Sequence, residues 1–193
     1  LTYPNTMLAG VERVGAQPAT SSMQLIPSVR KTPYFQPLED CIDALPKGRE
    51  GLQRAGDLHP ACFSYATTTA MLFDAGQTVD RCASEADIGL TYALRTGNDA
   101  GIGILLPYRK LIQSLRADPA RDDTSLLDDI GIPAKVTGSP VVTLVTSLTD
   151  ALLAVVFNDD EILTTQAAVT LTLLESIPGS FLLPWIYFVN GMA

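Results

Sequence analysis

Few side chains in this sequence belong to the types that do catalytic chemistry. His59 is the only histidine, and the cysteines are Cys41, Cys62 and Cys82. A single histidine excludes a metal site built from two or three histidines, so a zinc site would depend on the cysteines. The cysteines lie about twenty residues apart, which matches no Cys-x-x-Cys ligand pair. We therefore expect no metal site.

His59 and Cys62 are the one candidate pair for nucleophilic catalysis by a thiolate. Both fall at the expected start of a helix beside Pro60, and no Asn or Asp marks itself as the residue that would orient the histidine. We therefore expect a histidine at a helix start, a cysteine in the core and no enzymatic activity. The three cysteines are compatible with three reduced core thiols, or with one disulfide and a free thiol.

Paired carboxylates could bind Ca²⁺, and they occur at Asp122-Asp123, Asp128-Asp129 and Asp159-Asp160. None of the pairs has the alternating Asp-x-Asp-x-Asp-Gly spacing of a calcium-binding loop. The G-x-S-x-G and G-x-G-x-x-G motifs of hydrolases and dinucleotide-binding proteins are also missing. The basic stretch 47–56 contains three glycines but lacks the Gly-Lys-Ser/Thr order of a phosphate-binding loop. We interpret it as a connecting loop.

Residues 82–92, CASEADIGLTY, resemble the bilin-attachment helix of the phycobiliproteins. The cysteine, the acidic positions and Ile88, Leu90 and Tyr92 stand in a similar order, and the resemblance would make Cys82 the attachment position. It covers eleven residues of 193, and Ser84 stands where that family carries an arginine for a bilin propionate. We do not infer membership of the family, and we favour a core cysteine on an ordinary amphipathic helix.

The composition excludes some classes of partner. The chain has 193 residues, is 47% hydrophobic and carries a formal net charge of −8. Its mean hydropathy is +0.21. An acidic protein lacks the cationic surface that nucleic acids require, and it is repelled by anionic membranes. No apolar run reaches about twenty residues, so we expect no transmembrane helix. The first residue, Leu1, suggests a processed or trimmed N-terminus and, if processed, an organellar protein.

The periodicity of apolar residues predicts a mostly α-helical protein of about five to six helices with bundle-like packing. We expect Pro46 to end one helix and Pro107 to begin another, because proline cannot donate the helical hydrogen bond. The glycines of AGIGILL, before Pro107, suit a close approach between backbones. The expected helices are 37–45, 60–76, 78–96, 107–116, 140–157 and 160–178, with one short turn of helix at 125–130.

The most apolar part of the chain, 139–178, consists of two apolar segments joined by the polar sequence NDDE. Ser139 and either Asp159 or Asp160 are expected to cap two helices. Leu152 and Leu171 lie on apolar stripes, which predicts that both are buried. The alternative is a pair of strands, because residues 169–173 alternate with a period of two. The length of each run favours an antiparallel helical hairpin.

We divide the chain into an extended, proline-rich strap (1–37), a helical domain (38–178) and an aromatic C-terminal docking segment (179–193). Both ends carry large apolar side chains that a partner would cover. We predict that the contacts are made by Tyr3, Tyr34 and Phe35 in the strap and by Phe181, Trp185, Tyr187 and Phe188 in the C-terminal segment.

The function that we expect is that of a non-catalytic accessory or structural subunit of a larger complex. We expect that complex to be membrane-associated and the partners to be other protein subunits rather than nucleic acid. A helical protein that binds a small ligand or pigment, with AGIGILL or the C-terminal aromatic residues as walls, is one alternative. A self-assembling coat-type protein is another, and an enzyme that depends on a cysteine comes last. No cofactor is identified by the sequence.

Overall fold

The computed structural model describes residues 37–116, 133–177 and 180–193, and the chain in these ranges is mostly α-helical. The described ranges contain seven α-helices, slightly more than the five to six expected. They are α3 (Leu38–Ala55), α4 (Leu58–Asp74), α5 (Val79–Thr96), α6 (Asp99–Arg116), α7 (Pro140–Phe157), α8 (Asp160–Thr172) and α9 (Leu183–Met192), with the short 3-10 helices η2 (Ala134–Val136) and η3 (Leu174–Ser176). The strap and the short helix expected at 125–130 lie outside the described residues.

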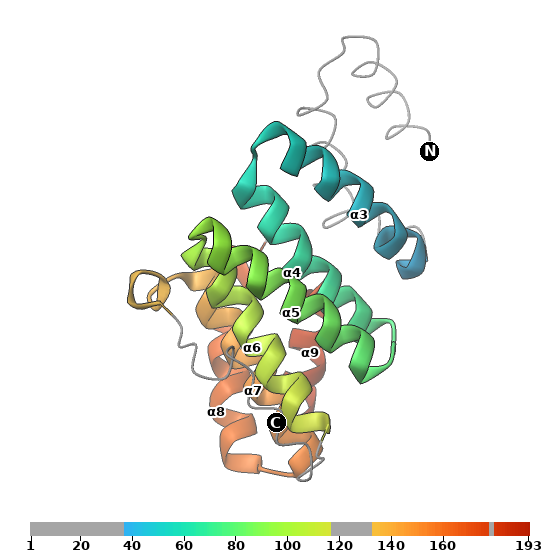
Figure 1. Cartoon of the computed structure of the whole chain (residues 1–193). Helices are drawn as coiled ribbons and strands as arrows, with labels where there is room; N and C mark the ends of the chain where they lie inside the picture. The colour runs from blue at the N-terminus through green and yellow to red at the C-terminus, as the bar shows by residue number, and fades with distance from the viewer. Residues whose placement is uncertain (1–36, 117–132, 178–179) are drawn as a thin grey trace, which may run out of the picture.

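Consecutive helices pack side by side, from α3 at one end of the molecule to α8 at the other (Figure 1). Helix α4 contacts α3, α5 and α6, and α9 returns onto α7 and α8. The buried apolar side chains form two clusters, and the larger one runs through the stack, since it includes Leu45 of α3, Leu111 of α6 and Ile186 of α9. The C-terminal helix is therefore packed on the helical hairpin that precedes it.

Helix α4 is buried along most of its length although it contains one serine and three threonines. The hydroxyls are satisfied within the helix. Thr68 Oγ1 donates to the Ser64 carbonyl at 2.8 Å, and Thr69 Oγ1 donates to the Tyr65 carbonyl at 3.0 Å. Bonds of this kind to the preceding turn remove the cost of burying an unpaired hydroxyl.

The expectation that Pro46 ends a helix was wrong, and so was the loop expected at 47–56. Helix α3 continues through Pro46 and ends at Gly56, which has a left-handed φ of 78°. A proline inside a helix costs about 3 kcal/mol, so contacts beyond it must outweigh that cost. Arg49 Nη1 donates to Glu85 Oε1 at 2.5 Å, and its guanidinium lies 3.7 Å from the centre of the Tyr65 ring. These contacts hold the second half of α3 against α4 and α5.

The helix start expected at Pro107 was also wrong, because α6 runs without a break from Asp99 to Arg116. The close approach expected at AGIGILL is confirmed. A Cβ atom on Gly103 would lie 2.9 Å from Cγ2 of Val142, and one on Gly101 would meet the sulfur of Cys62. The glycines therefore let α6 lie close to α4 on one side and to α7 on the other. Pro107 is buried inside this helix.

The helical hairpin at 139–178 is confirmed, and the strand alternative is wrong. Pro140 occupies the first turn of α7, as expected, but the Ser139 side chain makes no capping hydrogen bond. Asp159 caps α8 because its Oδ1 accepts from the backbone N–H of Ile162 at 3.0 Å. Asn158 ends α7 in the left-handed conformation, with φ of 57°. The turn is thus built from Asn158 and Asp159.

The two predicted core leucines have different outcomes. Leu152 is buried, as predicted, but Leu171 is 43% exposed, so that prediction was wrong. Thr170 is buried in its place, and its hydroxyl donates to the Ala167 carbonyl at 2.7 Å. Helix α8 also ends earlier than expected, at Thr172.

Among the helices in the described ranges, α7 alone is long and apolar enough to span a membrane, with a mean hydropathy of 1.9. Half of it is buried inside the protein, and it packs against α6, α8 and α9. Length and composition alone do not separate a membrane span from the core helix of a soluble protein. The position of α7 between three other helices accounts for its apolar sequence.

Candidate interaction surface

The candidate catalytic pair is not arranged for catalysis. Cys62 is fully buried against Gly101, whereas His59 is exposed in the first turn of α4. Burial raises the pKa of the Cys62 thiol to about 11, so very little thiolate forms at neutral pH. All three cysteines are free and buried, and desolvation also raises the pKa of Cys41 and Cys82.

Cys82, the attachment position implied by the resemblance to bilin-attachment helices, is also inaccessible to a ligand. Cys82 is fully buried on α5, while Ser84 on the same helix is exposed. The sulfur therefore points into the core of the protein. A bilin could not reach it in this conformation.

The residues that the structure describes contain no group of three or more metal-ligating side chains. Of the paired carboxylates, Asp159-Asp160 begins α8, where Asp159 is the capping residue. The other two pairs lie outside the described residues. The helix start gives the described pair a structural role.

The glycine-rich start of α6 does not form the wall of a large cavity. The space beside Gly101 and Gly103 is occupied by Cys62 and Val142. The hollow lined by His59, Phe63 and Ile104 holds about 10 Å³, too little for a pigment. Close helix packing, rather than ligand binding, explains these glycines.

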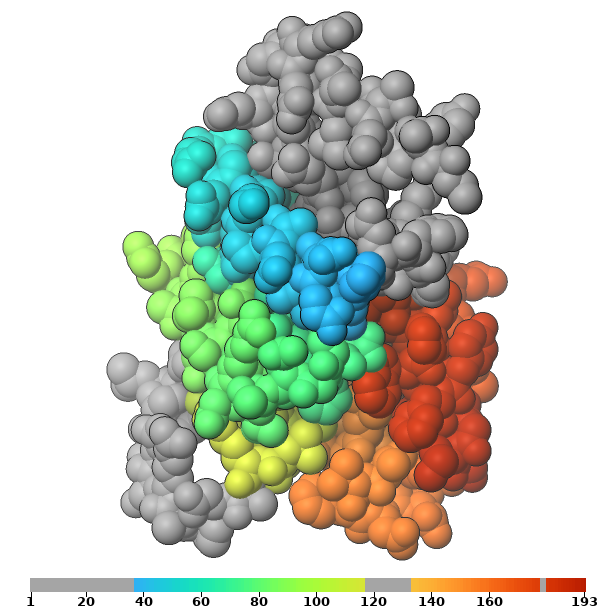
Figure 2. All heavy atoms as spheres, turned by 90° about the vertical axis from the view of Figure 1, so that its right-hand side faces the viewer, coloured from blue at the N-terminus to red at the C-terminus, as the bar shows by residue number. Residues whose placement is uncertain are grey.

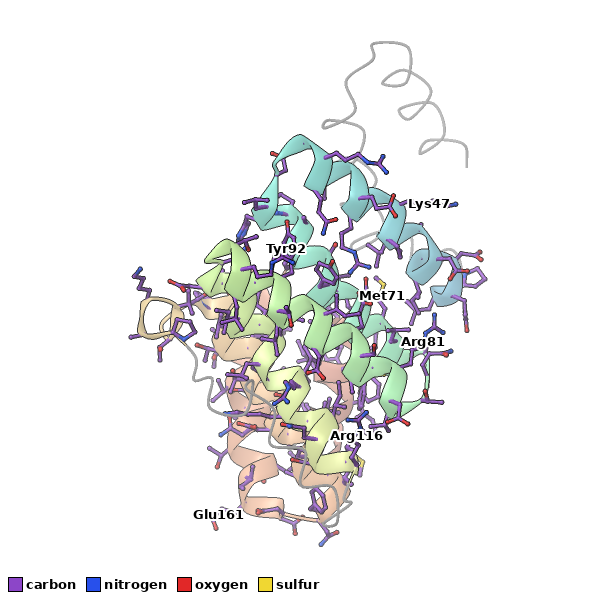
Figure 3. The ribbon with its side chains drawn as sticks, in the orientation of Figure 1. Lys47, Met71, Arg81, Tyr92, Arg116 and Glu161 are labelled. Atoms are coloured by element: carbon purple, nitrogen blue, oxygen red, sulfur yellow. The ribbon has the colours of Figure 1, made fainter. Side chains whose placement is uncertain are left out.

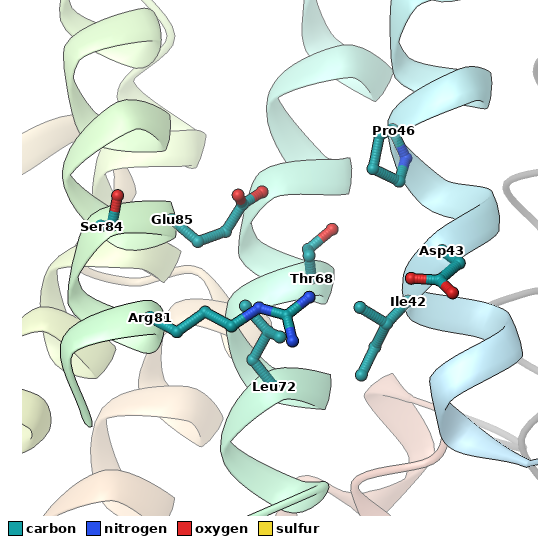
Figure 4. A pocket seen from close by; sticks show the side chains of 8 residues that line it. All are labelled: Ile42, Asp43, Pro46, Thr68, Leu72, Arg81, Ser84 and Glu85. Carbon is teal, nitrogen blue, oxygen red and sulfur yellow. The ribbon is translucent and has the colours of Figure 1, made fainter. Parts of the chain in front are cut away.

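A larger hollow of about 230 Å³ lies between α3, α4 and α5 (Figure 4). Asp43 of α3 and Arg81 of α5 lie on its two sides, and Leu72 of α4 lies between them. Arg81 is exposed and donates to Gln77 at 2.9 Å. Glu85 also lines the hollow, but its carboxylate is paired with Arg49. The hollow thus offers the Arg81 cation, the Asp43 carboxylate and an apolar floor.

Two places in the described chain expose several large apolar side chains: the turn between α7 and α8, with Val156, Phe157 and Ile162, and the outer face of α9, which we define by Tyr187, Phe188 and Met192. The exposed fractions of the three α9 residues are 60%, 44% and 55%. Residues 177–193 contain no charged side chain, so no charged group lies beside these three on their own helix. Figure 2 shows that α9 forms a large part of one side of the molecule. A helix that is apolar all round normally has neighbours on every side.

The inner face of α9 fixes the position of this surface. Ile186 and Val189 are fully buried, and Asn190 Nδ2 donates to Thr170 Oγ1 at 3.1 Å. Trp185 Nε1 donates to Asp74 Oδ1, at the end of α4, at 2.7 Å. The outer face is therefore presented by a helix anchored to both α8 and α4.

Trp185 connects the anchoring contacts to the exposed face. Its ring lies 6.0 Å from that of Phe73, centre to centre, and 5.8 Å from that of Phe188, which it meets edge-on. The pKa of Asp74 is raised because desolvation outweighs the hydrogen bond from Trp185. Phe188 is thus held by an aromatic neighbour although 44% of it is exposed.

The seven predicted contact residues fall into three groups. Phe181 is buried and Trp185 is half-buried, so both serve the packing of α9. Tyr187 and Phe188 point outward. The remaining three, in the strap, lie outside the described residues: Tyr3, Tyr34 and Phe35.

Met192 was not among the predicted contact residues, because they were chosen for their aromatic side chains. Its position one turn after Phe188 could have indicated it, since residues four apart share a helix face.

No protein-family model, curated protein or solved structure matches this chain.

Proposed function

We propose that the protein is a non-catalytic subunit of a larger assembly and that it docks to a partner through the outer face of α9. The observation that carries the proposal is the exposure of Tyr187, Phe188 and Met192 on a helix without charged residues. Exposed apolar surface of this kind is typical of protein interaction sites. Large aromatic side chains and methionine are also enriched at such interfaces.

A binding role agrees with the chemistry of the described core. The Cys62 thiol is buried with a raised pKa, and His59 lies apart from it on the surface. Trp185 and Asn190 hold α9 in place through side-chain hydrogen bonds, so the face is presented in a fixed conformation. Preorganisation of this kind lowers the entropic cost of binding.

The N-terminal strap is the second contact in this proposal. Tyr34 and Phe35 supply apolar groups of the same kind as the α9 face. Association of the whole assembly with a membrane, and an organellar location, remain predictions.

The native mass of the protein in an extract of its source tests the proposal. We expect the tagged wild-type chain to elute in an assembly well above its own 20.6 kDa. Tyr187→Ser/Phe188→Ser should elute as the free chain, because it removes most of the exposed apolar surface of α9. Ile88→Ser is the matched control, since Ile88 is 52% exposed on α5. An assembly that retains the double variant would rule out docking through α9.

The hollow between α3 and α5 favours a second candidate function, the binding of a small dipolar ligand. Arg81 could bind a carboxylate and Asp43 an ammonium group over the apolar floor at Leu72. Isothermal titration with free amino acids, compared between the wild type and Arg81→Gln, tests this. The same binding isotherm for the wild type and the variant would exclude the hollow as the binding site.

A further inference from the structure

The charges of the chain are divided unevenly between its two parts. Residues 136–193 contain no lysine, arginine or histidine, so all 13 basic residues precede Val136. The same stretch contains five carboxylates: Asp150, Asp159, Asp160, Glu161 and Glu175. It includes all of α7, α8 and α9. Five of the eight net negative charges therefore belong to the part that carries the docking face.

The helices that pack against α9 also lack positively charged side chains of lysine and arginine. Helices α7 and α8 contact α9, and α4 meets it at the hydrogen bond between Trp185 and Asp74. None of these three helices contains a lysine or an arginine. Their acidic side chains differ in their surroundings: Asp74 of α4 accepts from Trp185, Asp150 of α7 interacts with Lys110 of α6, and Asp160 and Glu161 begin α8. The 3-10 helix η3 adds Glu175 before α9 begins. Glu161 lies at the opposite end of the molecule from Lys47 (Figure 3).

We infer that the partner is a different protein that presents an apolar stripe flanked by lysines and arginines, as a basic amphipathic helix does. This inference rests on the proposed function and specifies its partner. The apolar stripe would cover Tyr187, Phe188 and Met192, in the manner of a helix laid on an apolar surface. The flanking cations would be attracted by the carboxylates of α8 and η3, two elements without lysine or arginine, whereas Asp150 of α7 already interacts with Lys110 of α6. Complementary charge raises the association rate and excludes wrong partners.

The same charges oppose two other occupants of the α9 face. An anionic lipid surface repels a region that holds five carboxylates and no cation. A second copy, docked with its own α9 against this one, would bring two such regions together. Self-association through this face therefore requires salt to screen the repulsion. A basic partner, by contrast, binds best at low salt.

Trp185 provides a direct signal for the experiment. It is the only tryptophan in the chain, and it lies against Phe188 of the docking face. The probes are two synthetic helical peptides with the same leucine stripe and without aromatic residues, one flanked by lysines and the other by glutamates. We expect the lysine-flanked peptide to shift the emission of Trp185 in a saturable manner. The Kd should increase severalfold between about 50 and 200 mM salt, because the Debye length falls to about half. The glutamate-flanked peptide should have no effect.

Three variants assign the signal. Tyr187→Ser/Met192→Ser leaves the pair of Trp185 and Phe188 intact and should abolish binding. Asp160→Asn/Glu161→Gln/Glu175→Gln should weaken only the contribution of charge and flatten the salt dependence. Ile88→Ser, on α5, should bind as the wild type does.

Each other outcome overturns the inference in a recognisable way. Equal binding of both peptides, lost in Tyr187→Ser/Met192→Ser, would keep α9 as a docking face but refute the basic partner. Failure of both peptides would refute the basic amphipathic partner, while the native-mass experiment still decides the proposed function. Binding to vesicles of anionic lipid, or dimerisation at low salt, would replace the basic partner with a membrane or a second copy.

Discussion

Gly101→Ala is expected to destabilise the protein, although alanine is the better helix former. The added Cβ would run into the sulfur of Cys62, which is fully buried between α4 and α6. Replacing glycine by alanine gains at most about 1 kcal/mol in a helix. Overpacking a core costs about 1–3 kcal/mol. Because the Cys62 sulfur is enclosed by the core, we expect the cost of overpacking to exceed the gain in helix propensity. The free energy of unfolding should fall by about 1–2 kcal/mol.

Urea denaturation followed by circular dichroism measures this loss. Gly191→Ala is the matched control, because a Cβ there meets nothing within 4 Å, and its stability should stay the same or rise. Cys62→Ala removes the clashing sulfur, so Gly101→Ala should cost less in that background than in the wild type. A fully additive double variant, or a Gly101→Ala protein as stable as the wild type, would refute the close contact between α4 and α6.

Three further results are expected. In urea melts, Leu152→Ala should cost about 2–5 kcal/mol as a core truncation, whereas Leu171→Ala should cost less than about 1 kcal/mol because its side chain is partly in water. Burial raises the pKa of Asp150 above its usual 3.8, so the ionised carboxylate destabilises the native state. Asp150→Asn should therefore raise the melting temperature at pH 7 but not well below pH 3.8, where the carboxyl is protonated in the folded and unfolded states. Asp160→Asn, at the start of α8, should lower the melting temperature slightly at pH 7. The three cysteines should react slowly with a thiol reagent until urea unfolds the chain; fast labelling of the native protein would contradict their burial.

Much of the helical content could be predicted from the sequence because several helix ends are marked by local chemistry. The expected helix 78–96 agrees with α5 to within one residue: Thr78 caps it, and Gly97 ends it with φ of 63°. Asp159 caps α8 in the same way. These signals act within a few residues, so they can be read without knowledge of the fold.

The two errors at prolines came from contacts between distant residues. Pro46 normally ends a helix, but Arg49 pairs with Glu85 of α5, 36 residues away. Pro107 is buried inside α6, and the same helix packs closely on Val142 of α7 at Gly103. No local rule states that these contacts exist, and their energies exceed the local preference for a break.

The docking face was found only in part for a similar reason. The C-terminal segment stood out by its aromatic content, but α9 is apolar on every side, so periodicity could not show which side is buried. The hydrogen bond from Trp185 to Asp74 spans 111 residues, and it turns Tyr187 and Phe188 outward. The orientation of α9 thus depends on α4.

Oxidation of Met192 by dilute hydrogen peroxide, read by mass spectrometry, tests most directly whether a partner covers the α9 face. Met192 is largely exposed and Met71 is fully buried, so the two residues give a signal and an internal control in one chain. We expect Met192 to oxidise readily in the isolated protein and much more slowly in the assembly purified from its source, with Met71 slow in both. Equal oxidation of Met192 in the free and assembled protein would contradict docking through α9.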